Sequence, residues 1–229
     1  MIDIEKLPHL LYNRSGKKGV NVMAELYLRR KIDRFLQLWK EDDDRKPLIV
    51  KGPRQVGKTE SLLRFAKANY QSVIYINFVE EPKYKMILED GYSAEDIIKN
   101  ISRIDPSKRF ETGNTVLFFD EIQVFSQIAT SLKFFKIDGR FDVICSGSLL
   151  GINYRQIESN SVGYKTDYTM SSLDFEEFLW AKGYGEDTIQ DMLRHMESFQ
   201  PFNQLEMNIY SGLFLDYCIL GGMPAVVRQ

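Results

Sequence analysis

The stretch IVKGPRQVGKTESLL, residues 49–63, decides the fold. A short apolar run leads into Gly52 and Gly57, and Lys58, Thr59 and a helix-like pattern follow. The eight residues from Gly52 to Thr59 fit the phosphate-loop pattern G-x-x-x-x-G-K-[ST] in full. The alternative is a chance match in a glycine-containing turn, but the motif also requires a strand before it and a helix after it, and the sequence indicates both. We therefore predict that this loop binds the phosphates of a nucleotide.

The composition of the loop suits this task. Glycines let the backbone turn so that its N–H groups line an anion-sized cup. The following helix directs its positive end at the phosphates. Lys58 is expected to bridge the β- and γ-phosphates, and the Thr59 hydroxyl is expected to ligate Mg²⁺. The expected nucleotide-binding residues of the loop are Gly52, Pro53, Arg54, Gln55, Val56, Gly57, Lys58, Thr59 and Glu60.

An acidic pair follows a second apolar run, TVLFFDEIQ, at residues 115–123. Phosphate-loop proteins usually hold Mg²⁺ through an acidic residue at the end of such a buried strand. Asp120 is the expected Mg²⁺ partner, directly or through water, and Glu121 is expected to orient or deprotonate the attacking water. The alternative is that the pair only ends a strand and caps the next helix. Neither a D-x-x-G sequence nor an N-K-x-D guanine reader occurs, which favours ATP over GTP.

Size and composition limit the class of protein. The 229 residues are 44% hydrophobic, which suffices for one sizeable core, and the net charge of −2 indicates no overall nucleic-acid surface. No N-terminal signal segment and no apolar run long enough for a membrane span occur, so we expect a soluble, cytoplasmic protein. Cys145 and Cys218 lie in apolar contexts and are expected to be reduced and buried. Without a Cys/His cluster around His9 or His195, we expect no structural zinc site.

Strand and helix patterns alternate over residues 47–172, which predicts an α/β fold with a mainly parallel central sheet and helices on both faces, the three-layer architecture of phosphate-loop NTPases. We expect an irregular segment over 1–21, an ATPase core over 22–172 and a helical lid or linker over 173–229. The expected strands cover 47–52, 72–78, 115–121, 140–148 and 165–171, and the expected helices include 22–40, 58–70 and 126–138. Ser93 and Asp96 are a helix-start signature.

Several stretches resemble a family of bacterial and archaeal AAA+-type ATPases related to the signal-transduction (STAND) ATPases. They occur in the same order as in that family: GPRQVGKTESLL, VIYINF, LFFDEIQ, VICSGSLLG, LDFEEFLWA and ILGGMPAVV. The resemblance spans about residues 22–229. Such proteins usually carry a C-terminal domain, so we expect this chain to be the N-terminal part of a longer protein.

The resemblance also assigns residues. Ser146 matches the polar sensor position between the acid and the γ-phosphate, with Ser148 as the neighbouring candidate; the alternative is a simple turn. Pro224 in GGMP matches a proline near adenine, with a helix-ending turn as the alternative. Arg29 and Arg30 lie where relatives place residues near the base, although at least one is expected on a solvated face. The expected catalytic residues are therefore Glu121, Lys58 and Ser146.

The resemblance has one departure in its motifs. Relatives often place Val-Gly-Lys or Gly-Arg before the FEEFL box, whereas this chain has Val162-Gly163-Tyr164 and then Lys165. A basic residue expected there to contact the γ-phosphate is therefore missing or shifted by one position. Slow ATP hydrolysis is the expected consequence. Arg140 and Arg155 are candidates for an arginine finger in trans, although a surface position is the simpler interpretation of each.

The function expected from these patterns is Mg²⁺-dependent hydrolysis of ATP to ADP and phosphate by a AAA+/STAND-like molecular switch. Two alternatives stay open, a nucleotide-binding module with negligible turnover and an ATP-dependent nucleic-acid-associated factor. The nucleic-acid-associated factor would use Arg14, Lys17 and Lys18 as a basic patch, for which a solvated N-terminus is the simpler interpretation. Expected partners are ATP and ADP, the C-terminal domain or another protein, and a second copy of the chain; nucleic acid is unsupported and no membrane is expected.

Overall fold

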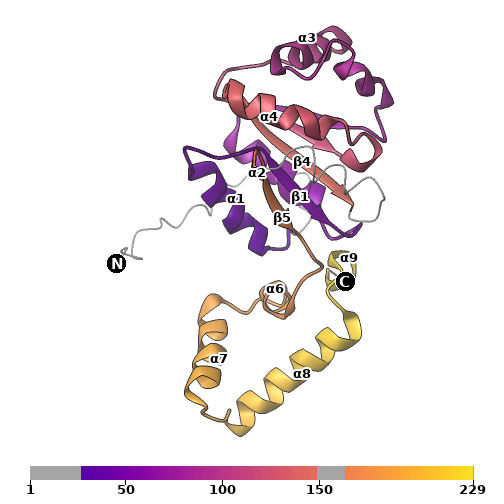
Figure 1. Cartoon of the computed structure of the whole chain (residues 1–229). Helices are drawn as coiled ribbons and strands as arrows, with labels where there is room; N and C mark the ends of the chain where they lie inside the picture. The colour runs from indigo at the N-terminus through magenta and orange to yellow at the C-terminus, as the bar shows by residue number, and fades with distance from the viewer. Residues whose placement is uncertain (1–26, 149–162, 229) are drawn as a thin grey trace, which may run out of the picture.

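A computed structural model of the chain describes residues 27–148 and 163–228. Within these ranges the strands form one parallel sheet in the order β2–β3–β4–β1–β5 (Figure 1). The expected parallel α/β architecture is confirmed. The strands are β1 (Leu48–Gly52), β2 (Ser72–Asn77), β3 (Thr115–Asp120), β4 (Asp142–Ser148) and β5 (Thr166–Thr169). The helices are α1 (Lys31–Glu41), α2 (Lys58–Asn69), η1 (Pro82–Leu88), α3 (Ala94–Ile104), η2 (Ile122–Val124), α4 (Ile128–Asp138), α6 (Phe175–Ala181), α7 (Glu186–Ser198), α8 (Gln204–Leu220) and α9 (Pro224–Val227).

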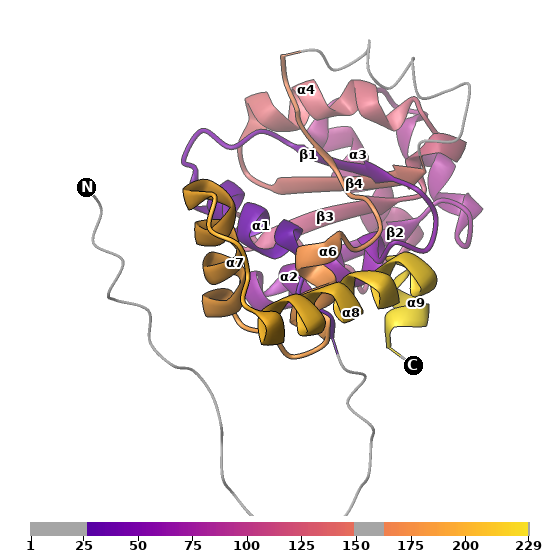
Figure 2. The same ribbon diagram turned by 90° about the horizontal axis from the view of Figure 1, so that it is seen from below.

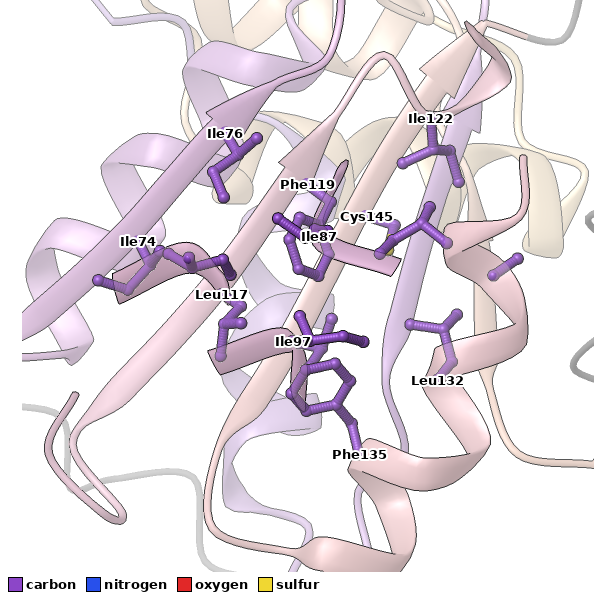
Figure 3. Packing of buried hydrophobic residues seen from close by; sticks show 14 of the residues in the cluster. Ile74, Ile76, Ile87, Ile97, Leu117, Phe119, Ile122, Leu132, Phe135 and Cys145 are labelled. Atoms are coloured by element: carbon purple, nitrogen blue, oxygen red, sulfur yellow. The ribbon is translucent and has the colours of Figure 1, made fainter. Parts of the chain in front are cut away.

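The central strands are apolar on both faces, which is typical of a parallel sheet covered by helices on both sides. On β3, Val116 and Phe118 pack with α1 and α2, whereas Leu117 and Phe119 pack with α3 and α4. Figure 3 shows this second cluster, in which Phe135 of α4 points toward the side chains of the sheet. This alternation has a consequence at the strand end, because the residue after Phe119 returns to the face that α2 covers.

The strand order brings the acidic strand and the phosphate-loop strand close without making them neighbours. Strand β4 lies between β1 and β3, with Val50 opposite Ser146 and Phe119 opposite Cys145. Since all strands are parallel, their carboxyl ends meet at one edge of the sheet. In open α/β sheets this edge is where ligands bind.

The structure corrects the expected start of the first helix. Residues 22–40 were predicted to be helical, but residues 27–30 are not helical and α1 begins at Lys31; residues 22–26 lie outside the described residues, as does the expected irregular segment 1–21. Arg30 has an extended backbone, and its N–H donates to the Asp33 carboxylate at 2.9 Å. That bond satisfies one of the amides that a helix start leaves without a partner. The apolar spacing continued through this break and did not reveal it.

Other predicted elements agree with the structure. The capping prediction at Ser93 is confirmed, because its hydroxyl accepts from the Asp96 N–H at 3.1 Å. The segment before it is a 3₁₀-helix that begins with Pro82. The short helix α9 was not predicted; it begins at Pro224, a residue whose fixed φ suits the first position of a helix.

The helices after β5 pack less tightly than the sheet. Helix α8 is rich in apolar residues, yet none of its residues is buried, and the side chains of Phe214 and Ile219 are 52% and 80% exposed. Figure 1 shows α7 and α8 extending away from the sheet, while α6 and α9 lie close to its edge, and Figure 2 shows from below how α8 runs from the end of α7 to α9. Among the described residues, no helix combines the length and the apolar character needed to cross a bilayer.

The two cysteines differ in environment. Cys145 is buried in β4, as expected, whereas Cys218 is exposed on α8, so the expectation of burial is wrong for Cys218. Both thiols are free. Burial raises the pKa of the Cys145 thiol, which therefore stays protonated and unreactive near neutral pH.

We therefore predict that a thiol reagent labels Cys218 rapidly and leaves Cys145 unmodified in the native protein. Mass spectrometry of the native chain should show a single adduct located on α8, and two adducts should form after denaturation in guanidinium chloride. Equal labelling rates for the two thiols in the native protein would contradict the packing described for β4.

Candidate nucleotide-binding site

The phosphate loop connects β1 to α2, and two of its glycines have positions that other residues would not tolerate. Gly52 has φ 158°, and a Cβ there would lie 1.9 Å from the carbonyl oxygen of Met170. Gly57 has φ 93° and is the N-cap of α2. The left-handed backbone at Gly57 favours glycine, and the close approach at Gly52 excludes any side chain. The loop therefore has the glycines that its shape requires.

Lys58 is the first residue of α2 and is almost fully buried. Its ammonium group donates to the carbonyl oxygens of Gly52 at 2.9 Å and Pro53 at 2.6 Å. Burial lowers the pKa of Lys58, and the nearby carboxylates of Glu121 and Asp120 oppose this effect. The cation is thus held inside the loop, beside the amides of the helix start, where an anionic ligand would meet both.

Asp120 ends β3 on the face that α2 covers, and its carboxylate gathers polar groups from three other elements. It accepts from the Thr59 hydroxyl at 2.8 Å, from the Tyr75 hydroxyl at 3.1 Å and from the Ser146 hydroxyl. Burial and the charge of Asp120 raise the pKa of Tyr75 to about 12, so this hydroxyl stays a donor. The carboxylate, only 2% exposed, is therefore held in place from β2, β4 and α2.

Glu121 follows at the strand end with a left-handed backbone (φ 56°). Its side chain makes no capping hydrogen bond to η2, which argues against the alternative of a helix cap. Instead, the Glu121 carboxylate accepts from the Gln123 amide, and the Gln123 carbonyl oxygen accepts from the Ser148 N–H at 3.2 Å. Gly147 makes room for this arrangement, because a Cβ there would lie 2.9 Å from the Gln123 oxygen.

A pocket of about 640 Å³ lies above these groups. Both the phosphate loop and the C-terminal end of the chain contribute to its walls. Its lining residues are Arg54, Gln55, Gly57, Lys58, Thr59, Glu60, Asn77, Val79, Glu80, Glu121, Pro224, Ala225 and Arg228. Pro224, selected by resemblance, thus lies in the same pocket as the phosphate loop.

Backbone contacts at Gly222 hold the C-terminal residues that line the pocket in position. The Leu173 N–H donates to the Gly222 carbonyl at 2.7 Å, and a Cβ on Gly222 would lie 2.0 Å from the Leu173 carbonyl. The Leu173 carbonyl also accepts from the Tyr217 hydroxyl at 2.9 Å. Across the pocket wall, Arg228 donates to the Glu60 carboxylate at 2.5 Å. The segment after α8 is therefore joined to the first turn of α2 and to the linker after β5.

The remaining expected site residues lie beneath or away from the pocket surface. Gly52, Pro53, Asp120 and Ser146 do not line it, and Ser146 is fully buried beneath Asp120. Val56 is also buried, with its side chain in the apolar cluster between the sheet, α1 and α2. Gly52, Pro53, Val56 and Ser146 can act on a ligand only through backbone groups or through a neighbouring side chain, whereas the Asp120 carboxylate lies directly beside the pocket-lining Thr59 hydroxyl.

The expected basic residues are engaged elsewhere. Arg29 stacks 4.1 Å from the Trp180 ring, and Arg30 is buried behind the loop. Arg140 precedes β4, at the edge of the sheet opposite the pocket, and pairs with Asp138 and Glu95. The Lys165 side chain is 6% exposed and pairs with Asp167. Arg155 and the patch of Arg14, Lys17 and Lys18 lie outside the described residues.

Oxygen donors suited to Mg²⁺ meet at one point of the site. Thr59 lines the pocket and its hydroxyl donates to the Asp120 carboxylate beneath it; hydroxyl and carboxylate oxygens are the ligands that Mg²⁺ prefers. In the described ranges, Asp191, His195 and Glu206 also bring ligand atoms within 4.8 Å of one another, between α7 and α8. None of these three lines the phosphate-loop pocket, so the donor set that fits a nucleotide-bound Mg²⁺ is Thr59 with Asp120.

Sequence reasoning missed three polar groups of the site. Asn77 ends β2 opposite Asp120, lines the pocket and accepts from the Val79 N–H at 2.9 Å. The position of Asn77 could have been predicted, because it ends the strand that precedes the acidic strand, and the carboxyl ends of parallel strands lie at one edge of the sheet. Tyr75 and Gln123 had no comparable signal, since their contacts depend on the register of β2 and on the turn after β3.

This sheet order, with a phosphate loop after β1 and a buried acid at the end of β3, defines a phosphate-loop NTPase domain. A family model described as "AAA domain" matches residues 44–179, more than half of the chain, and the chain belongs to that family of ATPases.

Three solved structures are similar in their chain path. They are a Walker-type ATPase of Pyrococcus abyssi (15% identity, TM-score 0.49, covering 88% of this chain and 66% of that one), PCH-2 of C. elegans (12%, 0.36, 71% and 45%) and Drosophila ORC bound to DNA (13%, 0.44, 72% and 48%). The chain thus spans less than two thirds of the length of each. No curated protein matches the sequence.

Proposed function

We propose that the protein hydrolyses MgATP to ADP and phosphate and acts as a AAA+/STAND-like switch. One observation carries this proposal: Lys58, at the start of α2, and Glu121, just after β3, line the same pocket as Pro224 and Arg228, from the segment after α8. A nucleotide bound there would contact both parts of the chain. Its hydrolysis could therefore change how the two parts are held.

The side chains divide the chemistry between them. The loop amides and Lys58 would bind the β- and γ-phosphates, and Thr59 with Asp120 would hold Mg²⁺, which neutralises phosphate charge when bound. Glu121 would accept the proton of a water whose oxygen forms the new bond to the γ-phosphorus, while the bond from that phosphorus to the ADP oxygen breaks. Ser146 and Tyr75 would act through Asp120 by fixing its carboxylate.

The switch requires a part that responds to the nucleotide. We propose that residues 173–229 act as a lid, because α9 contributes Pro224 and Ala225 to the pocket while Arg228 pairs with Glu60 of α2. We further propose a cytoplasmic protein whose lid acts on its own C-terminal region, on another protein or on a second copy. An arginine finger from Arg140 or Arg155 in trans would belong to that assembly.

A module that binds the nucleotide with negligible turnover is the second candidate. The hydrogen bond from Gln123 to the Glu121 carboxylate favours it, since a carboxylate held in this way is less available to water. Binding and turnover must therefore be measured separately.

We expect calorimetry to show one site for MgATP and MgADP, with weaker binding of MgGTP, and a phosphate-release assay to show slow turnover. The assay should be repeated with RNA, with DNA and with the C-terminal region of the full-length protein, because stimulation would identify what the switch acts on. Binding without phosphate release under all of these conditions would favour the nucleotide-binding module. Failure to bind either nucleotide would contradict the proposed function as a whole.

A further inference from the structure

Arg30 is a buried cation with partners in three separate segments. Its side chain is 5% exposed, and its guanidinium donates to the Val56 carbonyl at 2.6 Å and to the Ser171 carbonyl at 2.7 Å. Its Nε lies 3.1 Å from an oxygen of Glu177, which is also buried. Burying a charge is costly unless it is paired and hydrogen-bonded, so these contacts hold the side chain in one position.

The three partners belong to the parts of the molecule that a switch must connect. Val56 immediately precedes Gly57 and Lys58 in the phosphate loop, Ser171 lies in the linker after β5, and Glu177 lies in the first turn of α6. The Glu177 carboxylate also accepts from the Lys31 N–H at 2.7 Å, at the start of α1. One ion pair therefore joins the phosphate loop to the beginning of the helical segment.

The contact with Val56 has a direct effect on phosphate binding. In a planar trans peptide, the carbonyl of one residue and the N–H of the next point in opposite directions. Arg30 draws the Val56 carbonyl to its own side, so the Gly57 N–H is directed away from Arg30. Gly57 lines the pocket, and a Cβ on it would lie 3.6 Å from the Arg30 guanidinium. Arg30 thus orients one amide of the anion-binding cup without entering the pocket.

We propose that Arg30 is a positioning residue that couples nucleotide binding in the phosphate loop to the placement of α6 through its pair with Glu177. This inference rests on the proposed function. Coupling of this kind is reciprocal: if the fixed guanidinium favours nucleotide binding, then the nucleotide stabilises the contacts of α6 by the same factor. A merely structural ion pair would stabilise the fold without altering nucleotide affinity.

The test combines affinity with a local readout. Arg30→Met removes the donors and keeps an unbranched side chain, and MgADP affinity by calorimetry should fall by about 10- to 100-fold, the range for lost hydrogen bonds to a charged group. Hydrogen exchange of peptides covering 174–181 should slow on addition of MgADP in the wild-type chain and not in the variant. Glu177→Gln removes the ion pair and leaves Arg30 on Val56, so MgADP affinity should fall, by less than in Arg30→Met, and the protection of α6 should be lost.

Two further variants make the result decisive. Arg34→Met removes an exposed arginine from α1 and should match the wild type in both measurements. Arg30→Lys keeps the charge but not the fork of donors, and it should show an intermediate affinity even if Arg30→Met does not fold.

Wild-type affinity together with wild-type protection of α6 in either Arg30 variant would overturn the coupling and leave the proposed function intact. Absence of MgADP binding to the wild-type chain would overturn both.

Discussion

Lys58→Ala is expected to weaken MgATP binding by about two orders of magnitude, because hydrogen bonds from a cation to phosphate oxygens are among the strong ones. The ammonium group is held within the loop by the carbonyls of Gly52 and Pro53, so it is already placed beside the amides that a phosphate would contact. Calorimetric titration of the wild type and the variant with MgATP measures the loss directly.

The fold should survive this substitution. Lys58 is in the first turn of α2, where alanine is a favourable helix residue, and the two loop carbonyls can be hydrated once the side chain is removed. Lys67→Ala is the matched control, because it removes the same charge from an exposed position in the last turn of the same helix. Equal MgATP affinity in the wild type and Lys58→Ala would show that the phosphate loop does not bind the nucleotide as proposed.

The parts of the fold that could be predicted are those with a local pattern. The phosphate-loop sequence indicates β1 and α2 together, since its glycines, lysine and flanking periodicities have a single physical use. The apolar run before Asp120 indicates a strand buried on both faces, and parallel strands place its end near the loop. Ser146 was predicted as a site residue from the family resemblance, and in the sheet its hydroxyl donates to the Asp120 carboxylate.

The parts that could not be predicted depend on contacts between distant segments. Arg30 lies in a stretch with helical apolar spacing, and its extended backbone accompanies partners at Val56, Ser171 and Glu177 that no local pattern reveals. The exposure of the apolar side chains on α8 also depends on contacts between distant segments. The apolar surroundings of Cys218 suggested burial, yet burial requires a neighbouring element, and α8 has few contacts with the rest of the described chain.

Glu121→Gln is expected to lower ATP turnover by about 10²- to 10⁴-fold, the usual contribution of a general base. Glutamine keeps the size of the side chain and its capacity for hydrogen bonding, but it cannot take the proton of the attacking water. Glu121 lines the pocket and makes no capping hydrogen bond, so its carboxylate has no structural task that the amide would fail to perform. MgATP affinity should therefore stay within a few-fold of the wild type.

Single-turnover phosphate release, measured beside calorimetry on the same preparations, separates the two effects. Glu89→Gln is the control, because it makes the same change at an exposed carboxylate that does not line the pocket. The Glu121 variant should also accumulate the ATP-bound form, so any self-association that depends on ATP should increase in light-scattering measurements.

The wild-type rate itself is expected to be low. The Gln123 amide holds the Glu121 carboxylate, and the basic residue before FEEFL is displaced to Lys165, whose side chain pairs with Asp167. A low rate therefore does not distinguish a slow ATPase from a nucleotide-binding module. The ratio of the wild-type turnover rate to that of Glu121→Gln does distinguish them. A measurable wild-type rate that persists unchanged in Glu121→Gln would exclude this residue as the general base, because glutamine cannot accept the proton of the attacking water.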